Sequence, residues 1–311
     1  MKNEISYFSP LRIPEGRSGK FYIKHDLRKA GEKLPVVTAR DAIFQGKGQS
    51  HYVLKTDMII HRLCEGKSYD GGDGTWMSDC PQEIWSQKEI VDRAFGDVLV
   101  GGLGLGYIAK AINDSDAVRS VTVVERSKDV IKLVWKHLDV SKVRLVEDDL
   151  FKYLKRVKNK RRFDWAFYDI WAPTGESVLD EFIRPLRKAS IGVIDGYTND
   201  AEGRVLCWEE ATMLGQIKFH LAMDIQTWND ENEYFSRYRT CPAEKWHTPL
   251  MKESLKTQWP FLNWMRETKP TKDEADKALE RYIRDYSFID KWNSEWAKWD
   301  KLIPQKKGAV K

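Results

Sequence analysis

The sequence lacks the features of a membrane-spanning, exported or zinc-stabilised protein. No run of residues approaches the roughly 20 apolar positions that a membrane helix needs. The first residues, MKNEISYFSPLRIPEG, contain no apolar segment of the kind found in secretory signals. The four cysteines form no CxxC pair, so neither a zinc knuckle nor a redox motif is predicted, and no metal site is expected. We therefore expect reduced thiols in a cytoplasmic protein without a membrane partner.

The sequence also lacks a large excess of positive or negative charge. The 52 basic and 47 acidic residues leave a formal net charge of +5, spread along the chain. Two local basic runs, at residues 156–162 and in the tail after Lys301, are interpreted as a solvated connection and a frayed terminus. A nucleic-acid partner is therefore not predicted, although this balance does not exclude weak attraction to a polyanion.

Three zones follow one another along the chain. Residues 1–75 contain short alternating runs at 20–27, 34–44 and 51–63, with glycines between them, which predicts a small β-rich N-terminal domain. The second zone, from residue 76 to about 240, begins with apolar runs that alternate with helical patterns. The third zone, 241–311, is predicted to be a helical extension.

The apolar runs of the second zone predict five buried strands, at 97–102, 120–125, 142–148, 163–169 and 190–195. Helical patterns separate them at 105–113, 128–138, 150–157 and 177–188. Strands that alternate with helices of this size indicate βαβ units and a parallel sheet covered on both faces. The predicted fold class is therefore α/β, with a doubly wound, Rossmann-like sheet.

Tryptophan is concentrated near the C-terminus, where 8 of the 13 tryptophans follow residue 200. The segments 220–228 and 233–240 are predicted to form an antiparallel pair at the end of the sheet. Farther on, Phe288, Trp292, Trp296 and Trp299 fall on one face of a helix. We interpret this face as one that packs against the main domain. A stacking surface for nucleic-acid bases is the alternative.

The most informative segment is DVLVGGLGLG at 97–106, where a buried strand leads into a glycine-rich turn before a helix. Glycine lets the backbone turn tightly and approach a ligand, and the following helix offers unpaired N–H groups. Gly102, Gly104 and Gly106 form a GxGxG pattern. The dinucleotide pattern GxGxxG would place its third glycine at Tyr107 instead, which disfavours NAD.

Acidic residues end the next predicted strands, at the edge where open α/β sheets bind ligands. Glu125 ends the second strand and is expected to accept hydrogen bonds from ribose hydroxyls, which NAD and S-adenosylmethionine (SAM) share. Asp148 and Asp149 end the third, and Asp149 could also cap the helix that follows. Asp169 ends the fourth, and is the candidate catalytic residue that orients or deprotonates an acceptor.

Taken together, DVLVGGLGLG, VTVVERS, RLVEDDLFKYL and FDWAFYDIWAP resemble the spermidine synthase-like branch of the class I SAM-dependent methyltransferase superfamily. The resemblance covers about residues 76–200. It implies a SAM-binding domain in which Gly102, Gly104, Gly106 and Glu125 hold the cofactor. It also implies that Asp149 contacts the adenine amino group, with Asp148 and Leu150 as alternatives. A small β-domain ahead of the nucleotide-binding domain is a further feature of the family.

Two residues ahead of the glycine loop are assigned by the same resemblance. Related small-molecule methyltransferases carry a Met- and Glu-containing stretch that folds over the cofactor, which would make Met77 and Glu83 part of the site. A capped helix over 79–91, with Pro81 near its start, is the alternative interpretation.

The sequence departs from the aminopropyltransferases at the fourth strand. Their Asp-Ser-x-Asp-Pro motif is matched here only by Asp169 and Pro173, and the tyrosine- and histidine-bearing acceptor motif is not recognisable. The Asn/Asp-Pro-Pro-Tyr motif of DNA amino methyltransferases is absent as well.

These patterns predict an enzyme, a SAM-dependent methyltransferase with a small-molecule acceptor. The first alternative is an aminopropyltransferase that uses decarboxylated SAM, and the second is a non-catalytic binding module on the same fold. Assembly into a homodimer is left open. The acceptor is not readable, because methyl transfer requires alignment and exclusion of water more than particular side chains.

Overall fold

The computed structural model describes residues 11–37, 42, 48, 50–66, 74–171, 178–198, 204–213 and 277. The chain divides into two compact units. The first comprises residues 1–173 and 185–210, and the second comprises residues 174–184 and 211–311. All the strands described below belong to the first unit. The predicted division of the chain at residues 75 and 240 remains a prediction.

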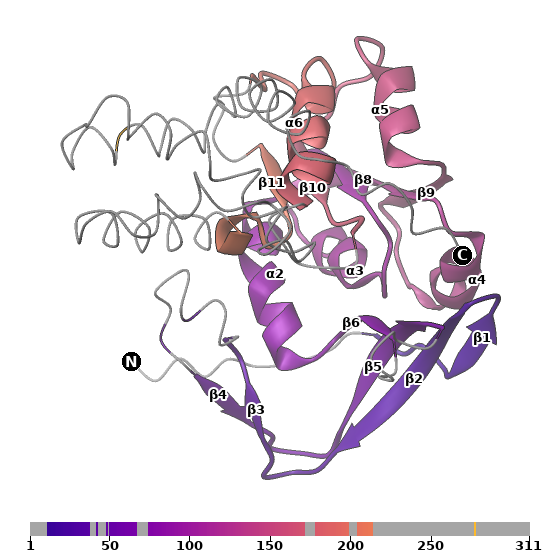
Figure 1. The fold of residues 1–311 in the computed structure, drawn as a ribbon, viewed down its shortest axis with the longest axis vertical. Helices are drawn as coiled ribbons and strands as arrows, with labels where there is room; N and C mark the ends of the chain where they lie inside the picture. Colours follow the sequence, from indigo (N-terminus) through magenta and orange to yellow (C-terminus); the bar gives the residue numbers. More distant parts are fainter. Residues whose placement is uncertain are drawn as a thin grey trace, which may run out of the picture. The chain divides into compact units, whose positions relative to one another are not determined.

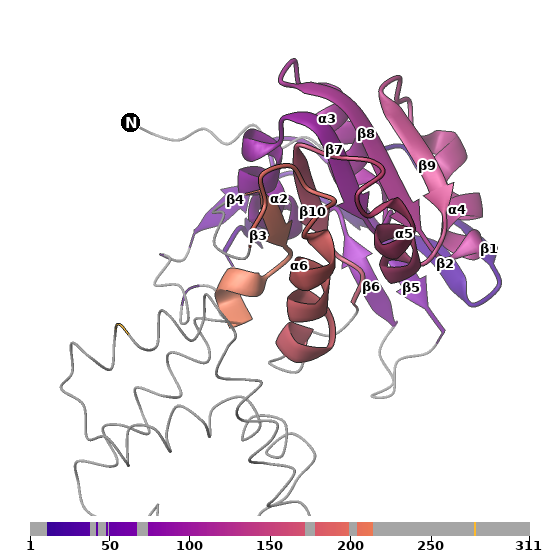
Figure 2. The ribbon, with the colours of Figure 1, turned by 90° about the horizontal axis from the view of Figure 1, so that it is seen from above.

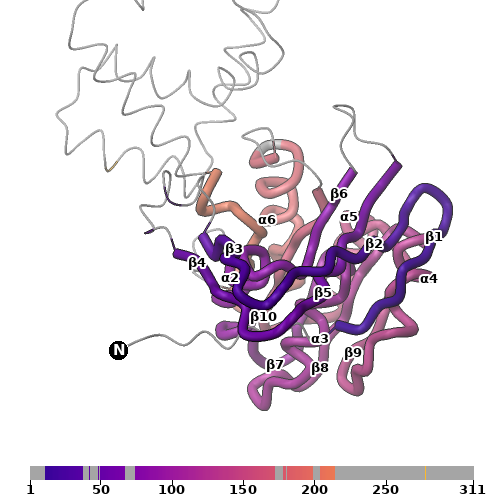
Figure 3. Tube along the Cα trace, turned by 90° about the horizontal axis from the view of Figure 1, so that it is seen from below, coloured from indigo at the N-terminus to yellow at the C-terminus, as the bar shows by residue number. Residues whose placement is uncertain are grey.

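The N-terminal part of the first unit is built from short antiparallel strands. One four-stranded sheet has the order β1-β2-β5-β6, with β1 Gly16–Ser18, β2 Phe21–Arg28, β5 Met58–Glu65 and β6 Thr75–Ser78. A separate pair joins β3 Lys33–Pro35 to β4 His51–Val53. The run predicted at 51–63 is thus two strands, because the chain turns between Val53 and Met58. Figure 3 shows the larger sheet, whose long strands β2 and β5 pair over eight residues.

The second part is a five-stranded parallel sheet of the order β11-β10-β7-β8-β9. Its strands are β7 Gly96–Gly101, β8 Val118–Glu125, β9 Val143–Glu147, β10 Trp165–Tyr168 and β11 Val205–Cys207. In chain order this is 3-2-1-4-5, the order of doubly wound nucleotide-binding sheets, and its part β10-β7-β8-β9 can be followed in Figure 2. The predicted α/β, Rossmann-like fold class is confirmed.

Helices cover both faces of the parallel sheet. Figure 1 shows α2 Pro81–Arg93, α3 Tyr107–Asn113 and α4 Lys128–Val134 between the two sheets. The other face carries α5 Leu150–Val157 and α6 Arg184–Ser190. The one-turn η1 Trp135–His137 follows α4, and a π-helical segment, η2 Leu179–Ile183, precedes α6 in the chain.

The side chains of successive strand residues point to opposite faces, which explains how this sheet is buried on both sides. Val98, Val100, Trp165 and Phe167 belong to one core cluster with apolar residues of α2, α3 and α4. The same cluster includes Phe21, Ile23 and Leu63 of the N-terminal sheet. The two sheets and the helices between them therefore share a continuous core. Toward the other face, Tyr168 bonds through its hydroxyl to Ser190 Oγ at 2.7 Å.

One predicted strand is wrong. Residues 190–195 do not form a strand but a turn, with isolated bridges from Ile194 to Ile191 and Phe163. Gly192 adopts a φ of +82°, a left-handed conformation that interrupts an extended run. The fifth strand is instead β11, which is only three residues long and pairs with β10.

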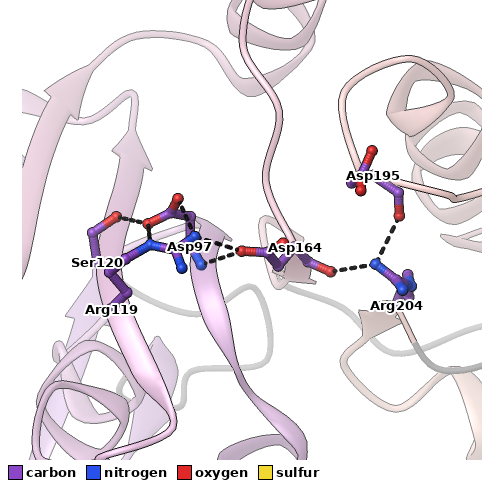
Figure 4. A network of polar contacts seen from close by, with 6 residues as sticks. All are labelled: Asp97, Arg119, Ser120, Asp164, Asp195 and Arg204. Carbon is purple, nitrogen blue, oxygen red and sulfur yellow. Dashed lines mark hydrogen bonds and ion pairs between the residues drawn. The ribbon is translucent and has the colours of Figure 1, made fainter.

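A polar network lies at the amino ends of β7, β8, β10 and β11 (Figure 4). Arg119 of β8 donates to Asp97 Oδ2 at 2.7 Å and to Asp164 Oδ2 at 3.0 Å. Ser120 Oγ donates to Asp97 at 2.6 Å, and Arg204 donates to the carbonyl oxygen of Asp195 at 2.9 Å. The Arg119 and Ser120 hydrogen bonds lower the pKa of Asp97, although burial opposes them. This network lies at the end of the sheet opposite the residues singled out in the sequence.

Several predicted segments lie outside the described residues. These are the antiparallel pair at 220–228 and 233–240 and the tryptophan-bearing helix around 288–299. Among the residues that are described, no helix is long and apolar enough to cross a membrane.

Candidate functional site: the carboxyl edge of the parallel sheet

The glycine loop follows β7 directly, and each of its three predicted glycines adopts a positive φ. The angles are +96° at Gly102, +51° at Gly104 and +77° at Gly106. Close packing adds to this requirement, because a Cβ built on Gly102 would lie 2.1 Å from the carbonyl oxygen of Asp169. A Cβ on Gly106 would lie 2.4 Å from Leu138 Cδ1. The glycines thus allow the loop to pass close to the end of β10 and to the segment after α4.

Met77, at the end of the N-terminal sheet, contacts this loop. Its Sδ accepts the backbone N–H of Leu105 at 3.0 Å. A Cβ on Gly104 would lie 2.1 Å from the same sulfur. A thioether is a weak acceptor, so this N–H is only weakly engaged. Met77 was assigned to the site from the sequence, and it does lie against the glycine loop.

Glu125 ends β8 and ties two segments together through its carboxylate. Oε2 accepts the N–H of Leu103 at 2.9 Å, and Oε1 accepts the N–H of Ser127 at 2.7 Å. Both oxygens keep a further lone pair, because an ionised carboxylate offers about four acceptor positions. The carboxylate is therefore held in a fixed orientation beside the glycine loop, and it can accept further hydrogen bonds from hydroxyl groups.

The two aspartates after β9 have different environments. Asp149 caps α5, since its Oδ1 accepts the N–H of Lys152 at 3.0 Å. Asp148 lies next to Glu125, whose carbonyl oxygen accepts the Asp148 N–H at 3.1 Å. The Asp148 carboxylate accepts the Asp149 N–H at 2.9 Å and is paired with Arg156. The predicted capping role of Asp149 is present in the structure, and contact with adenine remains a prediction.

Asp169 follows β10, and its backbone N–H is donated to Gly101 at 2.9 Å, which places it beside the glycine loop. Burial raises the pKa of its carboxyl group to about 7, and the negative charges of Glu209 and Glu125 add to the rise. The group can therefore exchange a proton near neutral pH, which suits a general base or acid.

Glu83 lies in the first turn of α2, and the helix predicted at 79–91 is observed at 81–93. Its Oε2 accepts the N–H of Ser78 at 2.7 Å and the Ser78 hydroxyl at 2.9 Å. Burial nevertheless raises the pKa of Glu83 to about 8, and the charges of Asp169 and Asp79 raise it further. The predicted helix and the placement of Glu83 near Asp169, which were alternatives in the sequence, therefore occur together, but no side chain caps the start of the helix, since the Asp79 carboxylate accepts hydrogen bonds from His61.

The structure brings the sequence-predicted residues to one edge of the sheet, around the switch point between β7 and β10. Three further features of this edge were not predicted. They are the charge of Glu209, the hydrogen bonds from Ser78 and the Leu103 N–H that Glu125 holds. Glu209 was missed because β11, which ends two residues before it, was assigned to the wrong segment. Among the described residues, no group of three or more His, Cys, Asp and Glu side chains could hold a metal ion.

No family model matches the chain, and no curated protein sequence matches it. Among solved structures, it is similar to a protein described as a SAM-dependent methyltransferase from Streptococcus mutans. The identity is 15% and the TM-score 0.33, over 47% of this chain and 42% of that one. It is also similar to spermidine synthase from Thermotoga maritima, at 16% identity and a TM-score of 0.35, over 59% of this chain and 55% of that one.

A spermidine synthase in complex with the transition-state analogue AdoDATO is matched as well, at 16% identity and a TM-score of 0.34. That alignment covers 59% of this chain and 54% of the synthase. The chain thus spans about half the length of these proteins, between 42% and 55%.

Proposed function

We propose that this chain is a transferase that binds SAM at the carboxyl edge of its parallel sheet and passes the methyl group to a small-molecule acceptor. The observation that carries the proposal is the fixed carboxylate of Glu125. It lies at the end of the strand beside β7 and accepts the loop N–H of Leu103. In doubly wound sheets, an acidic residue at this position accepts hydrogen bonds from ribose hydroxyls.

The residues present fit an adenosyl group. Glu125 has acceptor capacity for the two ribose hydroxyls, and the Asp148–Asp149 pair on the neighbouring strand end would receive the adenine amino group. The N–H of Leu105 is held only by the weak acceptor Met77, so a ligand carboxylate can replace the sulfur. When SAM is bound, its sulfonium supplies an activated methyl group.

The acceptor side of the site is assigned to Asp169. With a pKa near 7, this carboxylate can accept a proton from an acceptor amine or hydroxyl at one of its oxygens. Glu83, with a pKa near 8, is largely protonated at neutral pH and leaves Asp169 as the group that ionises first. The main task of the chain is to align the acceptor and exclude water.

Aminopropyl transfer from decarboxylated SAM is the second candidate, and one observation favours it. The negative charges of Glu209 and Glu125 both raise the pKa of Asp169, so carboxylates gather around this residue. A site with this much negative charge attracts ammonium groups. Decarboxylated SAM and a polyamine acceptor both carry them.

Calorimetric titration of the full chain with SAM, S-adenosylhomocysteine, decarboxylated SAM, methylthioadenosine and NAD tests the proposal. Saturable binding of SAM and S-adenosylhomocysteine supports methyl transfer. Preference for decarboxylated SAM and methylthioadenosine favours the second candidate. If no adenosyl compound binds, the proposal is wrong and a non-catalytic module becomes the better explanation.

The matched variants are Glu125→Gln and Glu147→Gln. Glu147 is the register partner of Glu125 on β9, and its side chain is half exposed beside Lys128. We expect Glu125→Gln to weaken SAM binding by about tenfold or more, the loss of one charge-assisted hydrogen bond. Glu147→Gln should leave the affinity within about twofold, because exposed ion pairs contribute little.

A further inference from the structure

The N-terminal part of the first unit contains a cavity of about 620 Å³, in the size range of small-molecule sites. Strands β2, β4 and β5 contribute to its walls, together with residues 11–14 and the turn before β5. None of the residues assigned above to the SAM site lines it. The cavity is therefore a separate feature, which the proposed transfer reaction does not account for.

The floor of this pocket is apolar and buried. Leu11, Ile13 and Leu54 are each no more than 4% exposed. At the rim, Ile59 is 46% exposed and lies opposite Leu27 on the neighbouring strand, which is 57% exposed. Exposed apolar pairs of this kind beside a hollow favour a ligand with an apolar body.

His61 brings a polar group to the apolar floor, and Asp79 fixes its orientation. Asp79 is 1% exposed and accepts both the ring Nδ1–H, at 2.7 Å, and the backbone N–H of His61, at 2.7 Å. With an ionised carboxylate at Nδ1, a neutral ring carries its proton on Nδ1 and keeps a lone pair on Nε2. Within the described ranges, Nε2 has no hydrogen-bond partner. A neighbouring ring, His25, packs edge-on against His61 at 4.8 Å between centroids.

The charges at the mouth favour an anion. Arg12 and Lys55 are exposed residues of the lining. Asp57, the one acidic residue among the described lining residues, is paired with groups outside the pocket. It accepts a hydrogen bond from Lys29 Nζ at 2.8 Å and another from the N–H of Ala30 at 2.9 Å. The pocket thus combines a cationic rim, an apolar floor and one oriented hydrogen-bond acceptor.

We propose that this pocket binds a small hydroxylated aromatic carboxylate, whose carboxylate lies at Arg12 and Lys55 and whose hydroxyl donates to Nε2 of His61. The aromatic body covers the apolar floor and packs against its side chains. The carboxylate of the ligand matches the cationic rim, its ring matches the apolar floor, and its hydroxyl matches the acceptor on His61. The carboxylate and the hydroxyl lie at opposite ends of the ring.

Titrations of the full chain with three probes of the same shape test this proposal. We expect 4-hydroxybenzoate to bind saturably, benzoate to bind about three- to tenfold more weakly for want of the hydroxyl, and 4-hydroxybenzylamine not to saturate. Failure of 4-hydroxybenzoate to saturate, or equal binding of the amine, overturns the proposal. SAM should not compete with 4-hydroxybenzoate, and competition would place the probe in the other site and likewise overturn the pocket assignment.

Variants locate the probe. Arg12→Gln and Lys55→Gln should each weaken 4-hydroxybenzoate about two- to fivefold, as expected for ion pairs at a solvent-exposed rim. Lys33→Gln is the matched control, since Lys33 is exposed on β3 and does not line the pocket. Equal affinities in all three variants contradict the proposed rim contacts.

His61 is buried, so its replacement could unfold the sheet, and a measurement on the unaltered chain is preferable. In ¹⁵N NMR, the Nε2 resonance of His61 should shift when 4-hydroxybenzoate is added and shift less with benzoate. A resonance that is unmoved at saturation overturns the assignment of the hydroxyl to His61.

Discussion

Glu125 holds the backbone of Leu103 through a hydrogen bond of 2.9 Å to Oε2, and this bond sets the conformation of the glycine loop. The other carboxylate oxygen holds the N–H of Ser127, at the start of α4. The carboxylate that is proposed to bind ribose therefore also supports the loop against which the ligand would lie. Binding and local stability are coupled at this residue.

We predict that Glu125→Ala lowers the free energy of unfolding as well as SAM affinity. Two backbone N–H groups lose their acceptor, at a cost of about 1–3 kcal/mol for each that stays unsatisfied. Thermal and denaturant unfolding measure the effect. Glu147→Ala, on the adjacent strand end, should change stability little. Unchanged stability of Glu125→Ala would show that water replaces the carboxylate at no cost.

The ionisation of Asp169 should be visible near neutral pH. We expect its carboxyl carbon to titrate in ¹³C NMR with a pKa of about 7, and Glu209→Gln to lower that value, because a neighbouring negative charge is removed. Transfer that needs the ionised carboxylate should then rise with pH through about 7. Asp169→Asn should lower kcat by about a hundredfold, the usual range for a general base, and leave SAM affinity unchanged. A titration near the ordinary value for aspartate would remove Asp169 from the catalytic role.

Glu83 should make stability depend on pH in a direction opposite to that of a salt-bridged carboxylate. Its folded-state pKa of about 8 lies above the ordinary value of 4.5, so the folded state binds the proton more tightly than the unfolded chain. The stabilisation is fully present below about pH 4.5 and is lost as pH rises through about 8.

The side chain in Glu83→Gln cannot ionise. The difference in Tm between this variant and the wild type should therefore shift in favour of the variant as pH rises from about 5.5 to about 8.5. Glu89→Gln, on the exposed side of the same helix, is the control, since the Glu89 side chain is 72% exposed and pairs with Arg93. A parallel pH dependence in wild type and Glu83→Gln would contradict the raised pKa.

Alanine substitutions at Gly102 and Gly31 distinguish two costs in unfolding free energy: that of the backbone conformation and that of close packing. Both have a left-handed φ, +96° and +89°, but a Cβ on Gly31 meets nothing within 4 Å. We expect Gly31→Ala to cost about 1–2 kcal/mol, the penalty for L-residues in this region. Gly102→Ala adds a collision with the backbone of Asp169 and should cost roughly 3 kcal/mol or more. Equal unfolding free energies for the two variants would contradict the close approach.

The helices and the central strands could be predicted because local pattern and tertiary environment agree there. The helix predicted at 150–157 is observed over the same residues, since Asp149 caps it and an apolar face continues through Leu150, Tyr153 and Leu154. The strands around Val98 and Val123 are buried on both faces, which a continuous apolar run anticipates.

The errors in the predicted secondary structure arise where contacts between distant segments determine whether a strand forms. The segment SIGVID contains a short apolar run like that of a buried strand, yet Gly192 bends the chain and Ser190 bonds to Tyr168 and to the carbonyl oxygen of Leu186. The true edge strand, Val205–Cys207, is too short to show a period. Because this strand was predicted at the wrong segment, Glu209 was not recognised as a charge that raises the pKa of Asp169. The hydrogen bonds of Glu83 to Ser78 were likewise out of reach, because they depend on how β6 turns into α2.

The strand order also has a consequence for how the protein is made. Strands β7, β8 and β9 are consecutive in the chain and adjacent in the sheet, so they can pair as soon as residues 96–147 have left the ribosome. At that moment β7 still has one open edge, which only Trp165–Tyr168 can close. Synthesis between Glu147 and Trp165 is therefore an interval in which this edge of the nascent sheet is exposed to wrong pairing, and a second such interval runs from Tyr168 to Val205, until β11 covers the edge of β10.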